Sequence, residues 1–201
     1  MSRENELAEL VRANDSILKL TGKRPRGYRS PAWDLSPNTL DLLLSEGFAY
    51  DSSMMGHDYL PYYVRHDQAD KIGNLLSPAE FGPNSRLLEM PISWSLDDYP
   101  HFEGFALQPA SGVLENWTAD FDYMQDTAEF GVLTYTFHPF VSGRGHRMRI
   151  MEQLIEHCKA KGAQFMAMEM AAEAARARHA SAGDGIAAHI SEQQGLLQSR
   201  V

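Results

Sequence analysis

Apolar residues recur at helical spacing in several separate stretches of this chain. Helix-end signals bound these stretches, such as Ser36 and Pro37 before the second stretch, and Gly22 and Gly47 after the first two. We therefore expect helices over residues 4–21, 36–46, 112–128, 146–161 and 170–180.

Shorter apolar and β-branched runs lie between these helices. We expect strands at residues 26–30, 48–52, 87–94, 131–137 and 164–168. Residues 53–86 show no period and are rich in Tyr, Pro, Gly and Asp, which predicts a long loop. Pro91 favours an edge strand or a bulge, because proline cannot donate a ladder hydrogen bond. Strands that alternate with helices predict an α/β fold with a largely parallel sheet or barrel.

Active residues of such folds lie just past the carboxyl ends of the strands, and residues 29–33 form the first segment at such a position. Pro31 fixes the backbone there, so that Arg29 and Trp33 can project into one cleft. Arginine is suited to holding a carboxylate, and tryptophan to packing on a sugar or a flat ring. A surface turn with a packed Trp33 explains the same residues, and the spacing leaves both interpretations open.

Two further segments follow strand ends. Asp97 and Asp98 stand beside a histidine in residues 95–102, where paired carboxylates can bind a metal or tune a neighbouring pKa. The same residues also make a good turn. The other segment is residues 138–145. His138 opens it at the end of the apolar strand predicted at 131–137 and precedes a proline, so it is a candidate proton carrier. A structural histidine is the alternative.

Composition narrows the classes of partner. The 201 residues are 43% hydrophobic and 22% charged, which is typical of a soluble domain. The net charge of −9 argues against nucleic acid and against an anionic membrane surface. Cys158 is the only cysteine, and we interpret it as a buried helix residue. Without a signal peptide or an apolar run of about 18 residues, a cytoplasmic protein is expected.

The three candidate segments together resemble the polysaccharide deacetylase family, the NodB-homology hydrolases. Arg-Ser-Pro-Ala-Trp at 29–33 is similar to the third motif of the family, Ser-Leu-Asp-Asp-Tyr-Pro at 95–100 to the fourth, and Leu-Thr-Tyr-Thr-Phe-His-Pro at 133–139 to the fifth. Residues 21–33 resemble the branch with peptidoglycan deacetylase-like and allantoinase-like members. The similarity runs from about Ser2 to Ala180, which predicts one domain over residues 1–180 and a polar tail over 181–201.

The resemblance implies a distorted (β/α) barrel that hydrolyses non-peptide carbon–nitrogen bonds. The substrate would be an N-acetyl amino-sugar polymer or a small cyclic amide. His138 would protonate the leaving amine, Arg29 would position a catalytic aspartate, and Asp97 or Asp98 would tune the histidine. Tyr28, Trp33 and Pro139 would line the substrate pocket.

The family also uses a zinc-like divalent metal, held by one Asp and two His, and a second Asp as the base. The sequence contains no strand that ends in paired Asp, no His-x-x-x-His and no other histidine pair at metal-ligand spacing, so we assign no metal ligands. We expect a partial barrel without its first strands. Three hypotheses follow: the C-terminal part of an active hydrolase, an inactive relative that binds carbohydrate or a partner protein, and a homo-oligomer that covers the exposed sheet edges.

Overall fold

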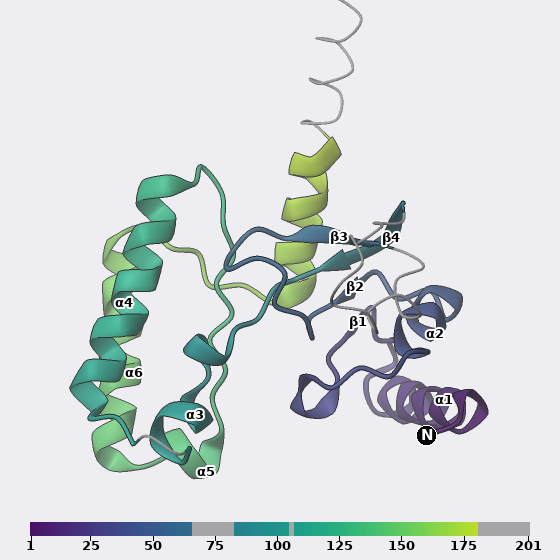
Figure 1. Cartoon of the computed structure of the whole chain (residues 1–201), viewed down its shortest axis with the longest axis horizontal. Coiled ribbons are helices and arrows are strands. Elements are labelled where there is room, and N and C mark those ends of the chain that lie inside the picture. Colours follow the sequence, from purple (N-terminus) through teal and green to yellow (C-terminus); the bar gives the residue numbers. More distant parts are fainter. Residues whose placement is uncertain (66–82, 105–106, 181–201) are drawn as a thin grey trace, which may run out of the picture. The chain divides into compact units, whose positions relative to one another are not determined.

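The computed structural model describes residues 1–65, 83–104 and 107–180 (Figure 1). It divides into two compact units, Met1–Phe165 and Met166–Val201. In the second unit, residues 168–180 form a helix, which agrees with the helix expected at 170–180. The tail predicted at 181–201 lies outside the described residues. No helix in the described ranges is long and apolar enough to cross a membrane.

A four-stranded sheet forms the centre of the first unit, in the order β1-β2-β4-β3. Its strands are β1 Gly27–Tyr28, β2 Tyr50–Asp51, β3 Tyr62–Arg65 and β4 Asn84–Glu89. β1, β2 and β4 are parallel, whereas β3 pairs antiparallel with β4. The α/β class and the mainly parallel sheet expected from the sequence are therefore confirmed.

Two expectations about this sheet are wrong. The predicted loop at 53–86 contains β3, and residues 66–82 of that loop lie outside the described ranges. β4 is an internal strand, and it ends at Glu89, before Pro91. Met90 donates to the Asp51 carbonyl and Ile92 to the Met54 carbonyl, so the donors towards the β2 segment are the residues on either side of Pro91, and an internal strand accommodates the proline.

Two other predicted strands do not form ladders. Residues 131–137 make a single parallel bridge, between Thr136 and Asp97, and residues 164–167 have no assigned secondary structure. Phe165 is 62% exposed. A β-branched or aromatic run needs a neighbouring strand to become part of a sheet, and among the described residues these runs have almost none.

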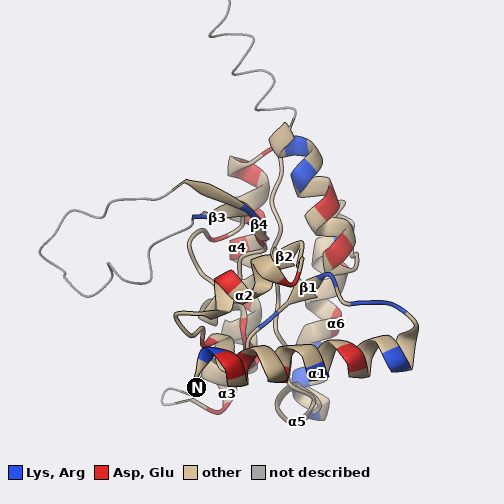
Figure 2. Cartoon of the chain, turned by 90° about the vertical axis from the view of Figure 1, so that its right-hand side faces the viewer, with Lys and Arg blue, Asp and Glu red and all other residues tan. Residues whose placement is uncertain are grey.

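One hydrophobic core lies between the sheet and two helices, α1 Arg3–Thr21 and α2 Thr39–Ser45. Its buried side chains are Leu10, Leu42, Leu43, Phe48, Val64 and Leu87. The Glu6 carboxylate accepts hydrogen bonds from Ser36 and Thr39 at 2.5 Å and so ties α1 to the start of α2. α2 begins at Thr39, later than predicted, and the Ser36 hydroxyl accepts the Asn38 backbone N–H in the turn ahead of it. Acidic and basic residues are interspersed along α1 (Figure 2).

The second core is formed mainly by α4 Ala110–Thr127 and α6 Gly145–Ala160, two helices that the sequence predicts and that pack against each other. Its largest buried side chain is Trp117, which is 0% exposed. Cys158 is buried in the same core, which confirms the interpretation made from its helical spacing. Two short helices, α3 Asp98–Phe102 and α5 Pro139–Ser142, cap one end of this layer and carry the candidate site.

Candidate functional site

Asp98 and His138 form a hydrogen-bonded pair at the start of α3 and just before α5. The Asp98 carboxylate is completely buried, whereas the His138 side chain is 36% exposed. Oδ1 of Asp98 lies 2.7 Å from Nδ1 of His138, and Oδ2 accepts the backbone N–H of His138 at 2.9 Å. Ser142 also donates to Oδ2. An ionised Asp98 therefore fixes the proton of the ring on Nδ1 and leaves Nε2 as the nitrogen available for chemistry.

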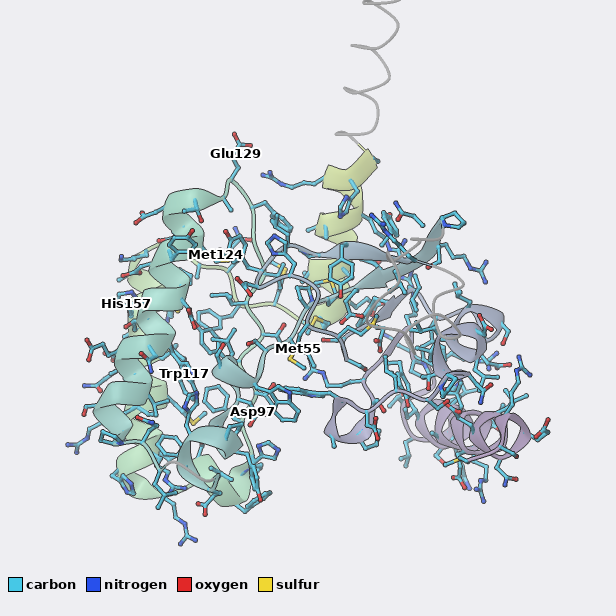
Figure 3. The ribbon with its side chains drawn as sticks, viewed as in Figure 1. Met55, Asp97, Trp117, Met124, Glu129 and His157 are labelled. Carbon is cyan, nitrogen blue, oxygen red and sulfur yellow. The ribbon has the colours of Figure 1, made fainter. Side chains whose placement is uncertain are left out.

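The two residues meet because their chain segments run side by side. Asp98 donates its backbone N–H to the carbonyl of Thr136, and Thr136 donates to the carbonyl of Leu96. The buried Trp117 donates its indole N–H to the Ser95 carbonyl at 2.8 Å, which ties the segment to the α4–α6 core. Figure 3 labels Trp117 and Asp97 at this junction. The core thus holds both halves of the pair in register.

Asp97 has a different role from Asp98. It is the N-cap of α3, where its Oδ1 accepts the backbone N–H of Tyr99 at 2.7 Å. The same oxygen is 3.8 Å from Nδ1 of His138. Burial raises the pKa of Asp97, and the capping hydrogen bond and the charge of His138 oppose that rise. Asp97 therefore adds a second carboxylate near the imidazole without holding it.

Asp97, Asp98 and His138 can each offer a ligand atom within 4.8 Å of the others, but they do not fit a metal centre. Both oxygens of Asp98 already accept protein donors, and Oδ1 of Asp97 caps a helix. A metal there would have to displace the hydrogen bond from the imidazole. We derive no catalytic step through a metal held by these three residues.

The Gly27–Trp33 loop begins with the two residues of β1 and ends in a 3-10 turn, η1 Pro31–Trp33. Ala32 and Trp33 have φ angles of 52° and 58°, in the left-handed region that costs a non-glycine residue about 1 kcal/mol. This backbone places the Trp33 ring against Trp94, with ring centroids 4.1 Å apart. Trp94 begins η2 Trp94–Leu96, three residues before Asp97. The two tryptophans thus bring the loop next to the segment that carries the Asp98–His138 pair.

Arg29 is held by the strand next to its own. Its Nε donates to the Ser52 carbonyl at 2.9 Å, and Nη2 donates to the Ser52 hydroxyl at 2.7 Å. The Ser52 hydroxyl in turn donates to the carbonyl of Met90, which follows β4. Burial lowers the pKa of Arg29, whereas the charges of Asp51, Glu89, Tyr50 and Asp97 raise it. The guanidinium lies within the field of these acidic groups and remains charged.

Two fully buried carboxyl groups lie beneath this loop. Asp51 and Glu89 are register partners on β2 and β4, so their side chains project from neighbouring strands about 5 Å apart. Two unit charges at that spacing repel by about 3 kcal/mol at an effective dielectric of ~20. Desolvation, and then the Asp51 charge, raise the pKa of Glu89 to about 10, and desolvation also raises that of Asp51. Glu89 therefore keeps its proton at neutral pH.

Aromatic rings surround His138. Tyr99 of α3 and Phe140 of α5 have ring centroids 5.8 Å and 5.4 Å from the imidazole and are 45% and 65% exposed. Pro139 is exposed and is the first residue of α5. Tyr28, by contrast, packs edge-on against Phe48 of the α1–α2 core, with ring centroids 6.1 Å apart. The structure thus gathers the predicted site residues other than Tyr28 around the Arg29 loop and the Asp98–His138 pair.

Sequence reasoning missed several residues of this site. Asp51 and Ser52 end the predicted strand at 48–52, Ser53 follows it, and Glu89 stands inside an otherwise apolar run. A charged residue in such a run is unusual and is a usable signal. Trp94, Tyr99 and Phe140 carry no such signal, because a single exposed aromatic residue in a helix of three to five residues has no pattern of its own.

Known proteins similar to this chain support the resemblance seen in the motifs. No protein-family model matches the chain. A peptidoglycan deacetylase from Helicobacter pylori is 34% identical over 171 residues, which are 78% of this chain and 58% of that protein. A peptidoglycan deacetylase-like protein from Gibberella zeae is 27% identical over 177 residues, which are 76% of this chain and 52% of that protein. The chain spans little more than half the length of these curated relatives.

Solved structures show the same partial match. A crystal structure named for a polysaccharide deacetylase of Mycobacterium smegmatis matches this chain with a TM-score of 0.69 at 30% identity. The match covers 89% of this chain and 58% of that one. The structure of Puue allantoinase matches with a TM-score of 0.67 at 24% identity, over 90% of this chain and 54% of that one. The fold is therefore that of part of a deacetylase-type domain.

Proposed function

Because the chain is related in sequence and fold to the polysaccharide deacetylases, the NodB-homology hydrolases, we propose that it supplies part of the active site of a hydrolase for non-peptide carbon–nitrogen bonds. The observation that supports this most directly is the Asp98–His138 pair. A buried carboxylate fixes Nδ1 of a partly exposed imidazole, which is the arrangement a general acid requires.

Hydrolysis of an amide needs a proton for the leaving amine. In this proposal Nε2 of His138 donates it, and the contact of Asp98 with Nδ1 supports this role because the carboxylate would stabilise the imidazolium. Asp97 adds negative charge 3.8 Å from Nδ1 and favours the charged ring further. The hydrogen bonds from Arg29 to Ser52 support the proposed role of Arg29, which is to orient a catalytic aspartate.

The proposed substrate is an N-acetyl amino-sugar polymer or a small cyclic amide. The exposed Trp94, the adjacent Trp33 and the rings of Tyr99 and Phe140 support the sugar, because aromatic faces pack on sugar rings. Pro139 would hold the turn that presents His138, and Tyr28 would act through the core beneath the loop.

An acetate-release assay with N-acetylglucosamine oligomers, and a ring-opening assay with a cyclic imide, test this proposal. Each is run with and without zinc for the wild-type chain and for His138→Ala. Turnover that is lost in His138→Ala supports it, and turnover retained in the variant would overturn the role of His138. Reading the gene upstream of Met1 for Asp-Asp and His-x-x-x-His tests whether a metal-binding half belongs to the same protein.

A second candidate is a non-catalytic relative that binds carbohydrate. The exposed aromatic rings favour it as much as they favour an enzyme. It predicts sugar binding that Trp94→Ala weakens, with no turnover at any metal concentration. Stoichiometric zinc binding in a calorimetric titration would count against it. The homo-oligomer and the cytoplasmic location expected from the sequence stay predictions, and light scattering at high concentration tests the first.

A further inference from the structure

The buried carboxyl pair beneath the Gly27–Trp33 loop has no part in the proposed proton transfer. Asp51 and Glu89 are both 0% exposed, and each ends a strand of the sheet. Burying two acids side by side is costly, so their presence calls for a function. Their hydrogen bonds lead to the segment that carries Arg29 and to the residues after β2 that bind it.

Hydrogen bonds connect Asp51 to the segment that carries Arg29, and Glu89 to the residues after β2. Ser30 donates its backbone N–H to the Ser53 hydroxyl at 2.9 Å, and that hydroxyl donates to Oδ1 of Asp51 at 2.8 Å. On the other side, Oε1 of Glu89 accepts the backbone N–H of Met54 at 2.9 Å. The residues after β2 are therefore held between the two acids, and among them Ser52 binds the guanidinium.

The remaining oxygens of the pair, Oδ2 of Asp51 and Oε2 of Glu89, have no hydrogen-bond donor among the described residues. One proton placed between the two carboxyls satisfies both oxygens and leaves a single negative charge. The other ionisable groups that act on the pair are Arg29, which is cationic, and Tyr62 on β3, the register partner of Glu89. Arg29 is thus the cation that balances the single charge.

We propose that Asp51 and Glu89 form one positioning unit for Arg29, in which a shared proton leaves one negative charge under the guanidinium. The unit acts through Ser52, Ser53 and the charge balance and does not touch a substrate. The effect of this unit on catalysis rests on the proposed function of Arg29. The existence of the unit does not.

A shared proton makes a specific prediction about substitutions. In Glu89→Gln the charge stays on Asp51. In Asp51→Asn the burial of Glu89 remains, but the repulsion from the Asp51 charge is gone and the Arg29 cation is still present, so the proposal requires Glu89 to ionise. Each single variant then keeps one charge. The double variant Asp51→Asn/Glu89→Gln keeps none. The effects of the two substitutions on Arg29 are therefore strongly non-additive.

The test measures hydrogen exchange of the Arg29 Nε–H by nitrogen-15 NMR in the full chain. Exchange is expected to be within about twofold of wild type in both single variants and in the control Glu115→Gln on the exposed face of α4, and at least about tenfold faster in the double variant. Additive effects, or a double variant that exchanges like wild type, would overturn the proposal.

Infrared spectroscopy gives an independent test that does not need the double variant. The wild type and Glu115→Gln should show the carbonyl stretch of a buried protonated carboxylic acid at neutral pH, and both single variants should lack it. A wild type without this band contradicts the shared proton. Neither measurement needs turnover, so a failure of the proposed hydrolase activity leaves this test intact, and a failure here leaves the role of His138 untouched.

Discussion

Asp98 holds His138 at two points, with Oδ1 2.7 Å from the ring Nδ1 and Oδ2 accepting the backbone N–H of the same residue at 2.9 Å. Both the orientation of the ring and the course of the chain at His138 therefore depend on one buried carboxylate. This double attachment distinguishes Asp98 from its neighbour Asp97, which the sequence alone presents as an equivalent candidate.

Asp98→Asn should separate catalysis from folding. The amide keeps the shape of the carboxylate but cannot stabilise an imidazolium, so an active enzyme should lose about a hundredfold or more in kcat. The loss of charge-assisted hydrogen bonds should cost about 1–3 kcal/mol in the free energy of unfolding. Urea unfolding and steady-state kinetics measure the two effects. Ser142→Ala, which removes one donor to the same carboxylate, is the control and should retain most of the rate.

Asp97 makes the stability depend on pH. Its pKa is raised in the folded state, so the folded chain holds more protons than the unfolded chain above the reference pKa of 3.8. The contribution of Asp97 to the free energy of unfolding is therefore present at low pH and is lost as pH rises through the raised pKa.

Asp97→Asn can still accept the Tyr99 N–H but does not titrate. We expect the unfolding free energy of the wild type to fall relative to that of Asp97→Asn as pH rises from about 4 to about 7. Urea unfolding of both proteins across this range is the measurement, and parallel pH profiles would contradict the shift.

Trp117 links the α4–α6 core to the site. Trp117→Ala should cost about 3–5 kcal/mol in unfolding free energy, because a large ring is removed from a fully buried position. Trp117→Phe keeps part of the packing, loses the hydrogen bond to the Ser95 carbonyl, worth about 1 kcal/mol, and leaves a smaller cavity, so its cost should lie above that of the bond alone and below that of Trp117→Ala. Chemical denaturation checks both values. Tyr123→Ala, at a ring 63% exposed on the same helix, should stay within about 0.5 kcal/mol of wild type.

Trp94 tests the aromatic surface. Its ring is 46% exposed and lies against Trp33, so Trp94→Ala should weaken binding of an N-acetylglucosamine oligomer by about tenfold while changing stability little. Calorimetric titration measures the affinity, with Tyr123→Ala as the aromatic control away from the site. Equal affinity of Trp94→Ala and wild type would remove Trp94 from the binding surface.

The sequence predicted the long helices well and the strands less well. α1, α4 and α6 present sustained apolar periods with clear end signals, and such patterns survive in any packing arrangement. Residues 131–137 have the most strand-like composition, yet make one bridge only, because a strand is defined by its neighbours. The Asp97–Asp98 turn proved to be a helix start, since Asp97 caps α3.

By itself, the sequence determined the α/β class, the helices and the three motif segments with Arg29, Asp97, Asp98 and His138, because local periodicity and short motifs are written in neighbouring residues. Only the tertiary structure decided which aspartate holds the histidine and that Asp51 and Glu89 lie under the arginine loop. Those relationships join residues 38 to 40 positions apart across adjacent segments, as with the Ser52 hydroxyl to Met90 and Asp98 to His138. Burial and strand register, which no local pattern encodes, set their chemistry.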